Sequence, residues 1–315
     1  MNGYDTEFLT NSHNIINQIK TVVVGKNKTL LWVLATILAK GHILMEDIPG
    51  VGKTTMAKAF AKTLGLTSNR VQFTPDVLPS DVTGFSILDQ KTGELQYKSG
   101  AVLCNLFLAD ELNRATSRTQ SALLEAMEEG QVTVDGVTHS IPQPFIVIAT
   151  QNPTGAAGTQ PLPDSQKDRF MVQISLGYPA AEDEIAMVAA RQGRDPLETL
   201  KPVISMQELV TMQNAVANTY ISDEMIQYAV SLVRLTRDHP KIEQGASPRA
   251  TLALVSMAKS FAMLRGRDYV IPRDIQDVFF HTVAHRINWK PDVKESDWST
   301  LMTNILRSIP APQLR

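Results

Sequence analysis

The chain has 315 residues, more than one average domain, and 43% of them are hydrophobic, which is enough for full cores. The 30 basic and 32 acidic residues leave a net charge of −2, which argues against nucleic-acid binding through a broad basic surface. The longest apolar run, at residues 30–39, is too short to span a bilayer, and no signal peptide is visible. The single cysteine, Cys104, allows no disulfide framework and fits a cytoplasmic protein.

The first half of the chain predicts alternating strands and helices. Apolar runs predict five strands, at residues 42–47, 70–73, 105–110, 145–151 and 170–176. The third and fourth runs are continuously apolar, as in a parallel sheet that is covered on both faces. Helical spacing occurs at residues 29–40, 53–65 and 118–130. Strands that alternate with helices in this way predict an α/β core.

Two segments interrupt the alternation, and a third region lacks strands altogether. Residues 84–100 and 130–142 alternate polar and apolar residues around turn-forming sequences, so both predict β-hairpins inserted in the core. After Tyr178 and Pro179 the strand patterns stop, and the remaining segments carry helical spacing. We therefore expect an α/β core at residues 1–179 and an all-helical domain at residues 180–315.

The sequence "EDIPGVGKTTMAKAF" has the pattern of a phosphate-binding loop between a strand and a helix. Glycines let backbone N–H groups approach phosphate oxygens, and the helix N-terminus adds partial positive charge. Lys53 would reach the β and γ phosphates, and Thr54 would offer its hydroxyl to Mg²⁺. The strict pattern begins with glycine where this chain has Asp47, a residue type that tolerates left-handed backbone. The alternative is a helix-capping glycine turn that binds nothing. The predicted nucleotide contacts are Pro49, Gly50, Val51, Gly52, Lys53, Thr54 and Thr55.

Two apolar strands end in polar residues that would complete such a site. Asp110 ends the third strand and would bind Mg²⁺ or its water, while Glu111 would polarise the water that attacks the γ phosphate. Gln151 and Asn152 end the fourth strand and would lie at the same edge of the sheet, where an amide can hold the attacking water. The alternatives are a solvated strand end for the acids and an ordinary loop turn for the amides.

These motifs together resemble the MoxR-type AAA+ ATPases, which belong to the helix-2-insert group. The segments "EDIPGVGKTT", "QFTPDVLPSDVTG", "LADELNRATSRTQSALLEAMEEGQVTVDG", "IATQNP", "GTQPLPDSQKDRF" and "GASPRA" occur in that family's order and spacing, over about residues 20–290. The resemblance implies a five-stranded parallel sheet of order 5-1-4-3-2, a C-terminal helical lid, and ATP between core and lid. Departures from the family pattern at residues 100–103 and 157–166 affect loops rather than the ATP chemistry.

The resemblance also implies roles for residues outside the phosphate loop. Asn152 matches the first sensor, Arg169 matches the arginine finger that reaches the γ phosphate of the neighbouring subunit, and Arg249 matches the second sensor on the lid. Val24 and Gly25 match the segment beside the adenine. Guanidinium groups suit these roles because they stabilise charge on transferring phosphoryl oxygens. Without the resemblance, an ordinary surface ion pair would be the simpler interpretation of each arginine.

The implied activity is Mg²⁺-dependent ATP hydrolysis by a homo-oligomeric ring, a hexamer by analogy, coupled to chaperone-like remodelling or maturation of proteins. The family's partners commonly carry von Willebrand factor A domains, the two hairpins would line the ring pore, and Arg114 would lie at a subunit interface. Two alternatives remain: a nucleotide-gated binding switch with slow hydrolysis, and a DNA-acting motor. The acidic balance and the lack of a helix-turn-helix pattern or a dense Lys/Arg segment make nucleic-acid binding the least favoured.

Overall fold

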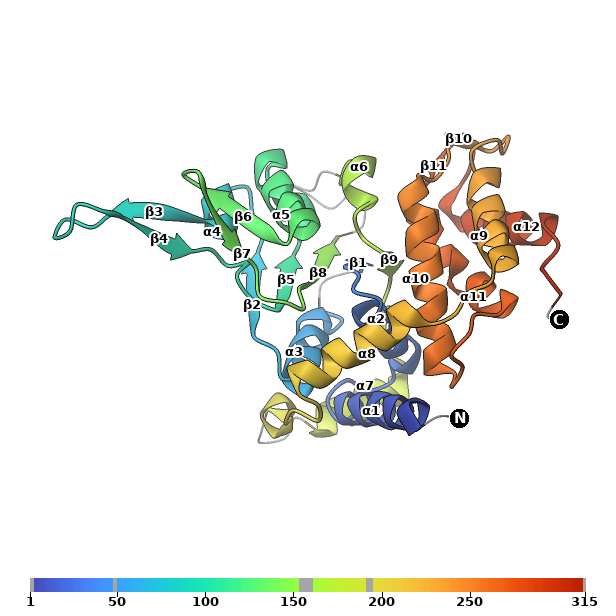
Figure 1. The fold of residues 1–315 in the computed structure, drawn as a ribbon, viewed down its shortest axis with the longest axis horizontal. Coiled ribbons are helices and arrows are strands. Elements are labelled where there is room, and N and C mark those ends of the chain that lie inside the picture. The colour runs from blue at the N-terminus through green and yellow to red at the C-terminus, as the bar shows by residue number, and fades with distance from the viewer. Residues whose placement is uncertain (1–2, 48–49, 153–160, 191–194, 314–315) are drawn as a thin grey trace.

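The computed structural model describes residues 3–47, 50–152, 161–190 and 195–313 (Figure 1). Its centre is a sheet of five strands, β1 (Ile43–Glu46), β2 (Ser68–Gln72), β5 (Leu106–Asp110), β8 (Ile146–Gln151) and β9 (Val172–Ile174). The spatial order is β2-β5-β8-β1-β9, and every pairing is parallel. Numbered along the chain, these core strands have the order 5-1-4-3-2, which confirms the predicted α/β fold class.

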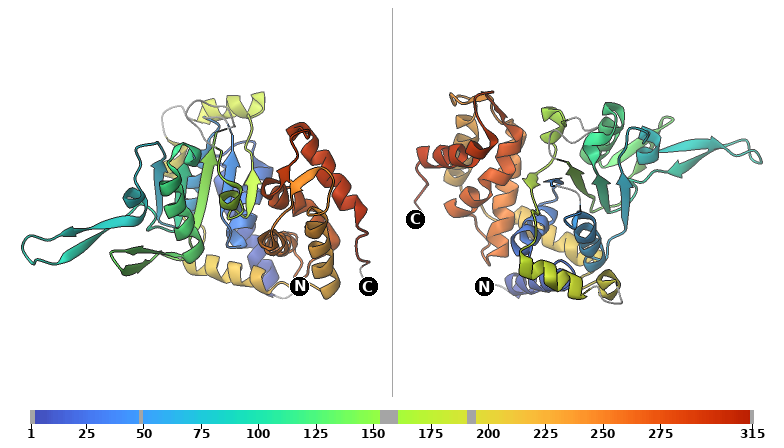
Figure 2. Two further views of the ribbon diagram at one scale, coloured as in Figure 1. Left: turned by 90° about the horizontal axis from the view of Figure 1, so that it is seen from above. Right: turned by 180° about the vertical axis from the view of Figure 1, so that it is seen from behind.

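Helices cover both faces of the sheet because successive side chains of each strand point in opposite directions. Leu106 and Leu108 of β5 pack in an apolar cluster with α2 (Asn27–Leu38) and α3 (Lys53–Thr63). Phe107 and Ala109, which alternate with them, enter a second cluster with α5 (Ser117–Glu129). The N-terminal helix α1 (Gly3–Lys20), which the sequence analysis did not anticipate, also contributes to the first cluster. Figure 2 shows these layers from two further sides.

Both predicted hairpins are present and project from the same side of the core (Figure 1). The first consists of β3 (Gly84–Leu88) and β4 (Leu95–Ser99) and follows the short helix α4 (Pro79–Thr83). The second consists of β6 (Gln131–Val134) and β7 (Val137–Ser140). Asp135 and Gly136 form its turn with φ values of 49° and 78°, as expected for the favoured two-residue hairpin turn.

After β9 the described part of the chain is helical, with one small exception. Its α-helices are α7 (Ala181–Ala190), α8 (Met206–Asn218), α9 (Asp223–Leu235), α10 (Pro248–Leu264), α11 (Pro272–Val283) and α12 (Glu295–Ser308), whereas the short helix α6 (Asp164–Lys167) precedes β9 in the α/β part. The exception is an antiparallel pair of very short strands, β10 (Ile242–Gln244) and β11 (Asn288–Trp289), which the helical periodicity does not reveal. None of the helices in the described part of the chain is long and apolar enough to cross a membrane.

The helical part is joined to the α/β part through a shared core. Apolar side chains of α8 to α12 enter the same cluster as those of α1 to α3. Ser260 and Gln213 donate hydrogen bonds of 2.8 Å to the carbonyl groups of Ala35 and Ile37 in α2. The division at residues 179 and 180 therefore stays a prediction, since one continuous cluster crosses it.

Candidate functional site

The two glycines of the phosphate loop have the backbone that the sequence pattern favours, whereas Asp47 does not have the left-handed backbone that its position suggested. Gly50 and Gly52 have φ values of 88° and 99°, in the left-handed region that favours glycine. A Cβ atom at either position would meet no heavy atom within 4 Å, so the backbone conformation, not crowding, requires glycine there. Helix α3 begins directly after Gly52, whose missing side chain leaves its first N–H groups without a side-chain cap, as an anion site needs. The predicted contact Pro49 lies outside the described residues.

Lys53 lies buried at the start of α3, among carboxylates. Its side-chain Nζ donates a 2.8 Å hydrogen bond to the carbonyl oxygen of Asp47, and only 6% of the residue is exposed. Burial lowers the pKa of Lys53, while the nearby carboxylates of Asp47, Asp110 and Glu111 act in the opposite direction. The structure thus brings the loop lysine to the two acids at the end of β5, as the sequence analysis expected.

Asp110 is 8% exposed, and each of its carboxylate oxygens has a side-chain partner. Thr150, near the end of the neighbouring strand β8, donates a 2.6 Å hydrogen bond to Oδ1. Arg70 of β2 approaches Oδ2 with Nη2 at 2.8 Å and Nε at 3.2 Å. The sequence analysis missed both partners. Only the pairing of β2, β5 and β8 places these side chains beside the acid.

Glu111 has a left-handed backbone, with φ of 57°, which is rare for a residue other than glycine and occurs often at functional sites. Its N–H donates a 2.8 Å hydrogen bond to the hydroxyl oxygen of Thr150, so one threonine orients both acids. Its carboxylate accepts a 2.8 Å hydrogen bond from Arg114. Burial opposes ionisation of Glu111, but hydrogen bonds from Arg114 and Asn152 outweigh it and hold its pKa below the ordinary value.

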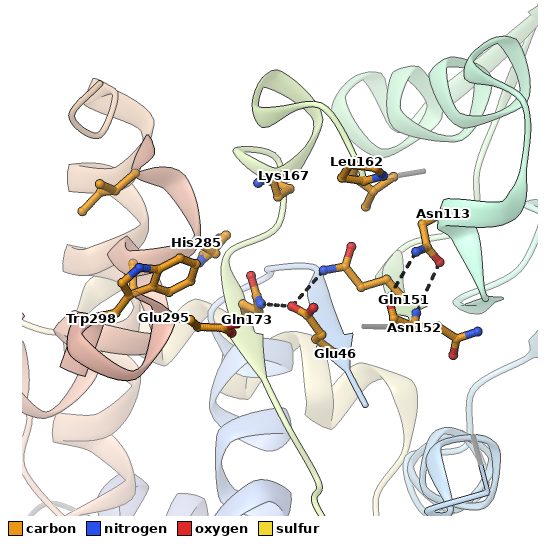
Figure 3. A pocket seen from close by; sticks show the side chains of 13 residues that line it. Glu46, Asn113, Gln151, Asn152, Leu162, Lys167, Gln173, His285, Glu295 and Trp298 are labelled. Carbon is orange, nitrogen blue, oxygen red and sulfur yellow. Dashed lines mark hydrogen bonds between the residues drawn. The ribbon is translucent and has the colours of Figure 1, made fainter. Parts of the chain in front are cut away.

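Asn152 is fixed through its main chain, which leaves its side chain for other contacts. The Asn113 amide donates to the carbonyl oxygen of Asn152 at 3.2 Å and accepts from its N–H at 3.3 Å (Figure 3). Among the described residues, the buried Oδ1 of Asn152 has no hydrogen-bond partner. Gln151 lies differently, because its amide donates to Glu46 at 3.0 Å and points into the pocket of Figure 3. Of the two amide side chains, that of Asn152 therefore interacts with Glu111, whereas that of Gln151 interacts with Glu46.

Arg169 and Arg249 form a second group, built around one carboxylate. Arg169 follows α6, and its Nη1 lies 2.6 Å from Oε2 of Glu128 in α5. Arg249, in the first turn of α10, places Nη2 2.6 Å from Oε1 of the same residue. Arg169 also donates to the carbonyl oxygen of Leu124 at 2.8 Å. The residues that the resemblance matches to the arginine finger and to the second sensor thus lie together, and the sequence did not reveal Glu128.

Asp168 docks the helical part beside this group. Its carboxylate accepts hydrogen bonds from Ser247 at 2.9 and 3.1 Å, and its Oδ1 lies 3.0 Å from Nη1 of Arg286. The Arg286 side chain is only 1% exposed, and burial lowers its pKa to about 10 although Asp168 opposes that shift. Asp168 therefore binds the core to the lid at the base of the helix that carries Arg249.

Val24 and Gly25, predicted to lie beside the adenine, precede α2 on the side of α7. Gly25 has a φ of 74°. This left-handed backbone favours glycine, and a Cβ atom there would also come within 2.0 Å of the Asp183 carboxylate, which would have to move. Thr54 and Thr55 are half-buried in the first turn of α3.

The phosphate loop, the acidic pair and both arginines lie within the matches to known families. A family model for the ATPase family associated with various cellular activities (AAA) matches residues 42–172, and an AAA lid domain model matches residues 234–305. Over 310 residues the chain is 38% identical to Chaperone MoxR1 of Mycobacterium tuberculosis, covering 95% of this chain and 82% of that protein. The chain belongs to the MoxR-type AAA+ ATPases.

Two further comparisons cover most of the chain. The Bacillus subtilis protein called Uncharacterized protein YeaC is 48% identical over 279 residues, which cover 89% of this chain and 87% of that protein. A crystal structure of a protein assigned as an ATPase, from Cytophaga hutchinsonii, superimposes with a TM-score of 0.90 at 35% identity, covering 98% of this chain and 97% of that one. This MoxR-type chain therefore carries Lys53, Glu111 and Arg169 inside its AAA match and Arg249 inside its lid match.

Proposed function

We propose that this MoxR-type protein hydrolyses ATP with Mg²⁺ at sites shared between neighbouring subunits of a homo-oligomeric ring, a hexamer by family analogy. The observation that carries the proposal is the division of the site residues into two groups. Lys53 lies with Asp110 and Glu111 at the strand ends, whereas Arg169 and Arg249 lie together on Glu128. The first group suits binding of phosphates and activation of water, and the second offers the cations that stabilise phosphoryl transfer.

The residues of the first group have the chemistry that hydrolysis needs. Because the pKa of Glu111 is lowered, its carboxylate is ionised at neutral pH and can orient and polarise a water molecule. Oδ1 of Asn152, which has no hydrogen-bond partner in the described part of the chain, can accept a hydrogen bond from the same water. Mg²⁺ commonly binds through one or two protein oxygens together with phosphates, and Thr54 and Asp110 offer such a hard-oxygen set. The bound cation would neutralise phosphate charge.

A nucleotide-gated switch with slow hydrolysis is the second candidate, and two ion pairs favour it. Arg70 is bound to Asp110 at 2.8 Å, and Arg114 is bound to Glu111 at 2.8 Å. Both acids of the proposed hydrolytic centre therefore carry a cationic partner in this protomer. If those pairs persist with nucleotide bound, ATP would change the conformation without being cleaved quickly.

Protein remodelling is the proposed output of the ring, with proteins that carry von Willebrand factor A domains as the family's usual partners. The first hairpin supports a protein-binding role, since Phe85, Leu88 and Leu95 are 47%, 62% and 65% exposed on it. A DNA-acting motor is less favoured by the net charge of −2. The buried Cys104 is in keeping with the expected cytoplasmic location.

Mixing two inactive variants tests whether the sites are shared. We expect Lys53→Ala to lose nucleotide binding and Arg169→Ala to bind ATP without hydrolysing it. In a mixed ring, the intact phosphate loop of an Arg169→Ala subunit would face the intact Arg169 of a Lys53→Ala subunit, so ATPase activity should return. The Lys53→Ala/Arg169→Ala double variant is the matched control and should restore nothing in either mixture.

Three results would decide against parts of this proposal. Full activity of Arg169→Ala alone would remove the intersubunit arginine from the site. Mixtures that stay inactive although rings form would place all required residues within one subunit. A negligible wild-type rate at concentrations where rings form, with tight ATP binding, would favour the switch.

A further inference from the structure

A short segment between β9 and α7 is held by a buried carboxylate at the start of the phosphate loop. Oδ1 of Asp47 accepts hydrogen bonds from the hydroxyl group of Ser175 at 2.6 Å and from the N–H of Gly177 at 2.9 Å. Oδ2 accepts from the N–H of Leu176 at 2.7 Å. Gly177 has a φ of 61°, and a left-handed residue in such a place lets successive N–H groups converge on one anion. Asp47 itself is only 5% exposed.

The carbonyl groups of the same segment are held from the other side by a lysine. Nζ of Lys26 lies 2.7 Å from the carbonyl oxygen of Leu176, 3.0 Å from that of Gly177 and 2.8 Å from that of Tyr178. An ammonium group has three donors, and three carbonyl oxygens receive them here. Residues 175–177 therefore donate hydrogen bonds to the Asp47 carboxylate, and the carbonyl groups of residues 176–178 accept hydrogen bonds from the Lys26 ammonium group.

The two charged residues adjoin different parts of the predicted nucleotide site. Asp47 precedes the phosphate loop, and its carbonyl oxygen holds Nζ of Lys53 at 2.8 Å. Lys26 directly follows Gly25 in the segment predicted to lie beside the adenine. Asp183, in the first turn of α7, lies against Gly25. Residues 175–178 thus connect the phosphate loop to the segment predicted to lie beside the adenine.

We infer that Asp47 and Lys26 are positioning residues for nucleotide binding, which set the spacing between the phosphate loop and the adenine-side segment before ATP arrives. This inference rests on the proposed ATP site. It also explains why this chain departs from the strict phosphate-loop pattern at Asp47. The residue has no left-handed backbone to accommodate, and its side chain instead accepts hydrogen bonds from the buried N–H of Leu176, the half-buried N–H of Gly177 and the hydroxyl group of Ser175. Preorganisation of this kind raises affinity because binding no longer has to order the segments.

Binding of a fluorescent ATP analogue by the full-length chain tests the inference. Asp47→Gly restores the strict loop pattern, so a pattern-based view expects unchanged or tighter binding. We expect the dissociation constant instead to rise about tenfold or more, which corresponds to about 1.4 kcal/mol. Lys26→Met should weaken ATP to a similar extent, and Lys28→Met, an exposed neighbour on α2, is the matched control that should bind like wild type.

Inorganic tripolyphosphate separates positioning from general damage. Lys26→Met leaves the phosphate loop intact, so its tripolyphosphate affinity should stay within about twofold of wild type while its ATP affinity falls. Thermal unfolding identifies any Asp47→Gly protein that fails to fold, and Lys26→Met then carries the test. ATP binding as tight as wild type in either folded variant, or equal losses of ATP and tripolyphosphate in Lys26→Met, would overturn the inference. Wild-type protein that binds neither ligand would instead overturn the proposed function.

Discussion

Arg169 and Arg249 donate to opposite oxygens of the same carboxylate, that of Glu128, at 2.6 Å each. One arginine follows α6 of the α/β part and the other lies on α10 of the lid, so the pair exists only when lid and core are docked. Glu128 is thus the place where the two cations of the proposed shared site are held together in one protomer.

Two carboxylates at this junction should contribute very differently to stability. Glu128 and its arginines are partly exposed, so Glu128→Gln should lower the free energy of unfolding by less than about 1 kcal/mol. Asp168→Asn should cost about 3 kcal/mol, because it leaves the buried guanidinium of Arg286 without its charged partner. Urea unfolding of both variants measures the difference. Equal losses would show that Asp168 and Arg286 do not dock the lid.

Arg114 should set the acid side of the pH–rate profile. Its hydrogen bond helps to hold the pKa of Glu111 below the ordinary value, against the effect of burial. Because its pKa is lowered, Glu111 stays ionised at pH values at which an ordinary glutamate would already be protonated. Activity that needs the carboxylate should therefore be lost only below the ordinary pKa of glutamate. In Arg114→Met the pKa should rise, and the acid limb of kcat should move to higher pH. Arg118→Met, a substitution of a nearby exposed residue, should leave the acid limb in place. If the acid limb does not move in either variant, ionisation of Glu111 does not control the rate.

Arg70 should compete with Mg²⁺ for Asp110. The guanidinium donates to Oδ2 through two nitrogens, while its own side chain is 43% exposed. Arg70→Ala should therefore change the free energy of unfolding by less than about 1 kcal/mol. It should also reduce, by several-fold, the Mg²⁺ concentration needed for half-maximal binding of a non-hydrolysable ATP analogue. Calorimetric titration of Mg²⁺ against the protein and analogue measures this, and an increased Mg²⁺ requirement would show that Arg70 assists the site.

His42 should make the protein less stable in mild acid. Burial lowers its pKa to about 4, although its hydrogen bond to the carbonyl group of Met127 acts in the opposite direction. Between pH 6.5 and 4 the unfolded chain therefore binds a proton that the folded chain does not, and stability falls as the pH falls, by up to about 1.4 kcal/mol per pH unit. Unfolding free energies at pH 7 and pH 5 should show a smaller difference in His42→Gln than in wild type. Identical pH dependence in the two proteins would exclude His42 as the source.

The sequence was sufficient for the elements whose pattern is local. Continuous apolar runs predicted the buried strands, and Asp135 with Gly136 predicted the turn of the second hairpin, because two-residue turns require particular backbone angles. The sequence also placed the acids and Asn152 at strand ends, which parallel pairing brings to one edge. It missed helix α1 and the strands β10 and β11, which carry no distinct local pattern or are too short for one.

Local chemistry, and the resemblance built on it, therefore identified the phosphate loop, the acidic pair and the family of this protein without any coordinates. Tertiary structure alone decided the partners of those residues: Thr150 and Arg70 on Asp110, Glu128 beside the two arginines, and Asp47 on residues 175–177. The physical reason is that such contacts join residues far apart in the chain. Hydrogen bonds and ion pairs depend on distance in space, which strand order and helix packing set and which no local spacing encodes.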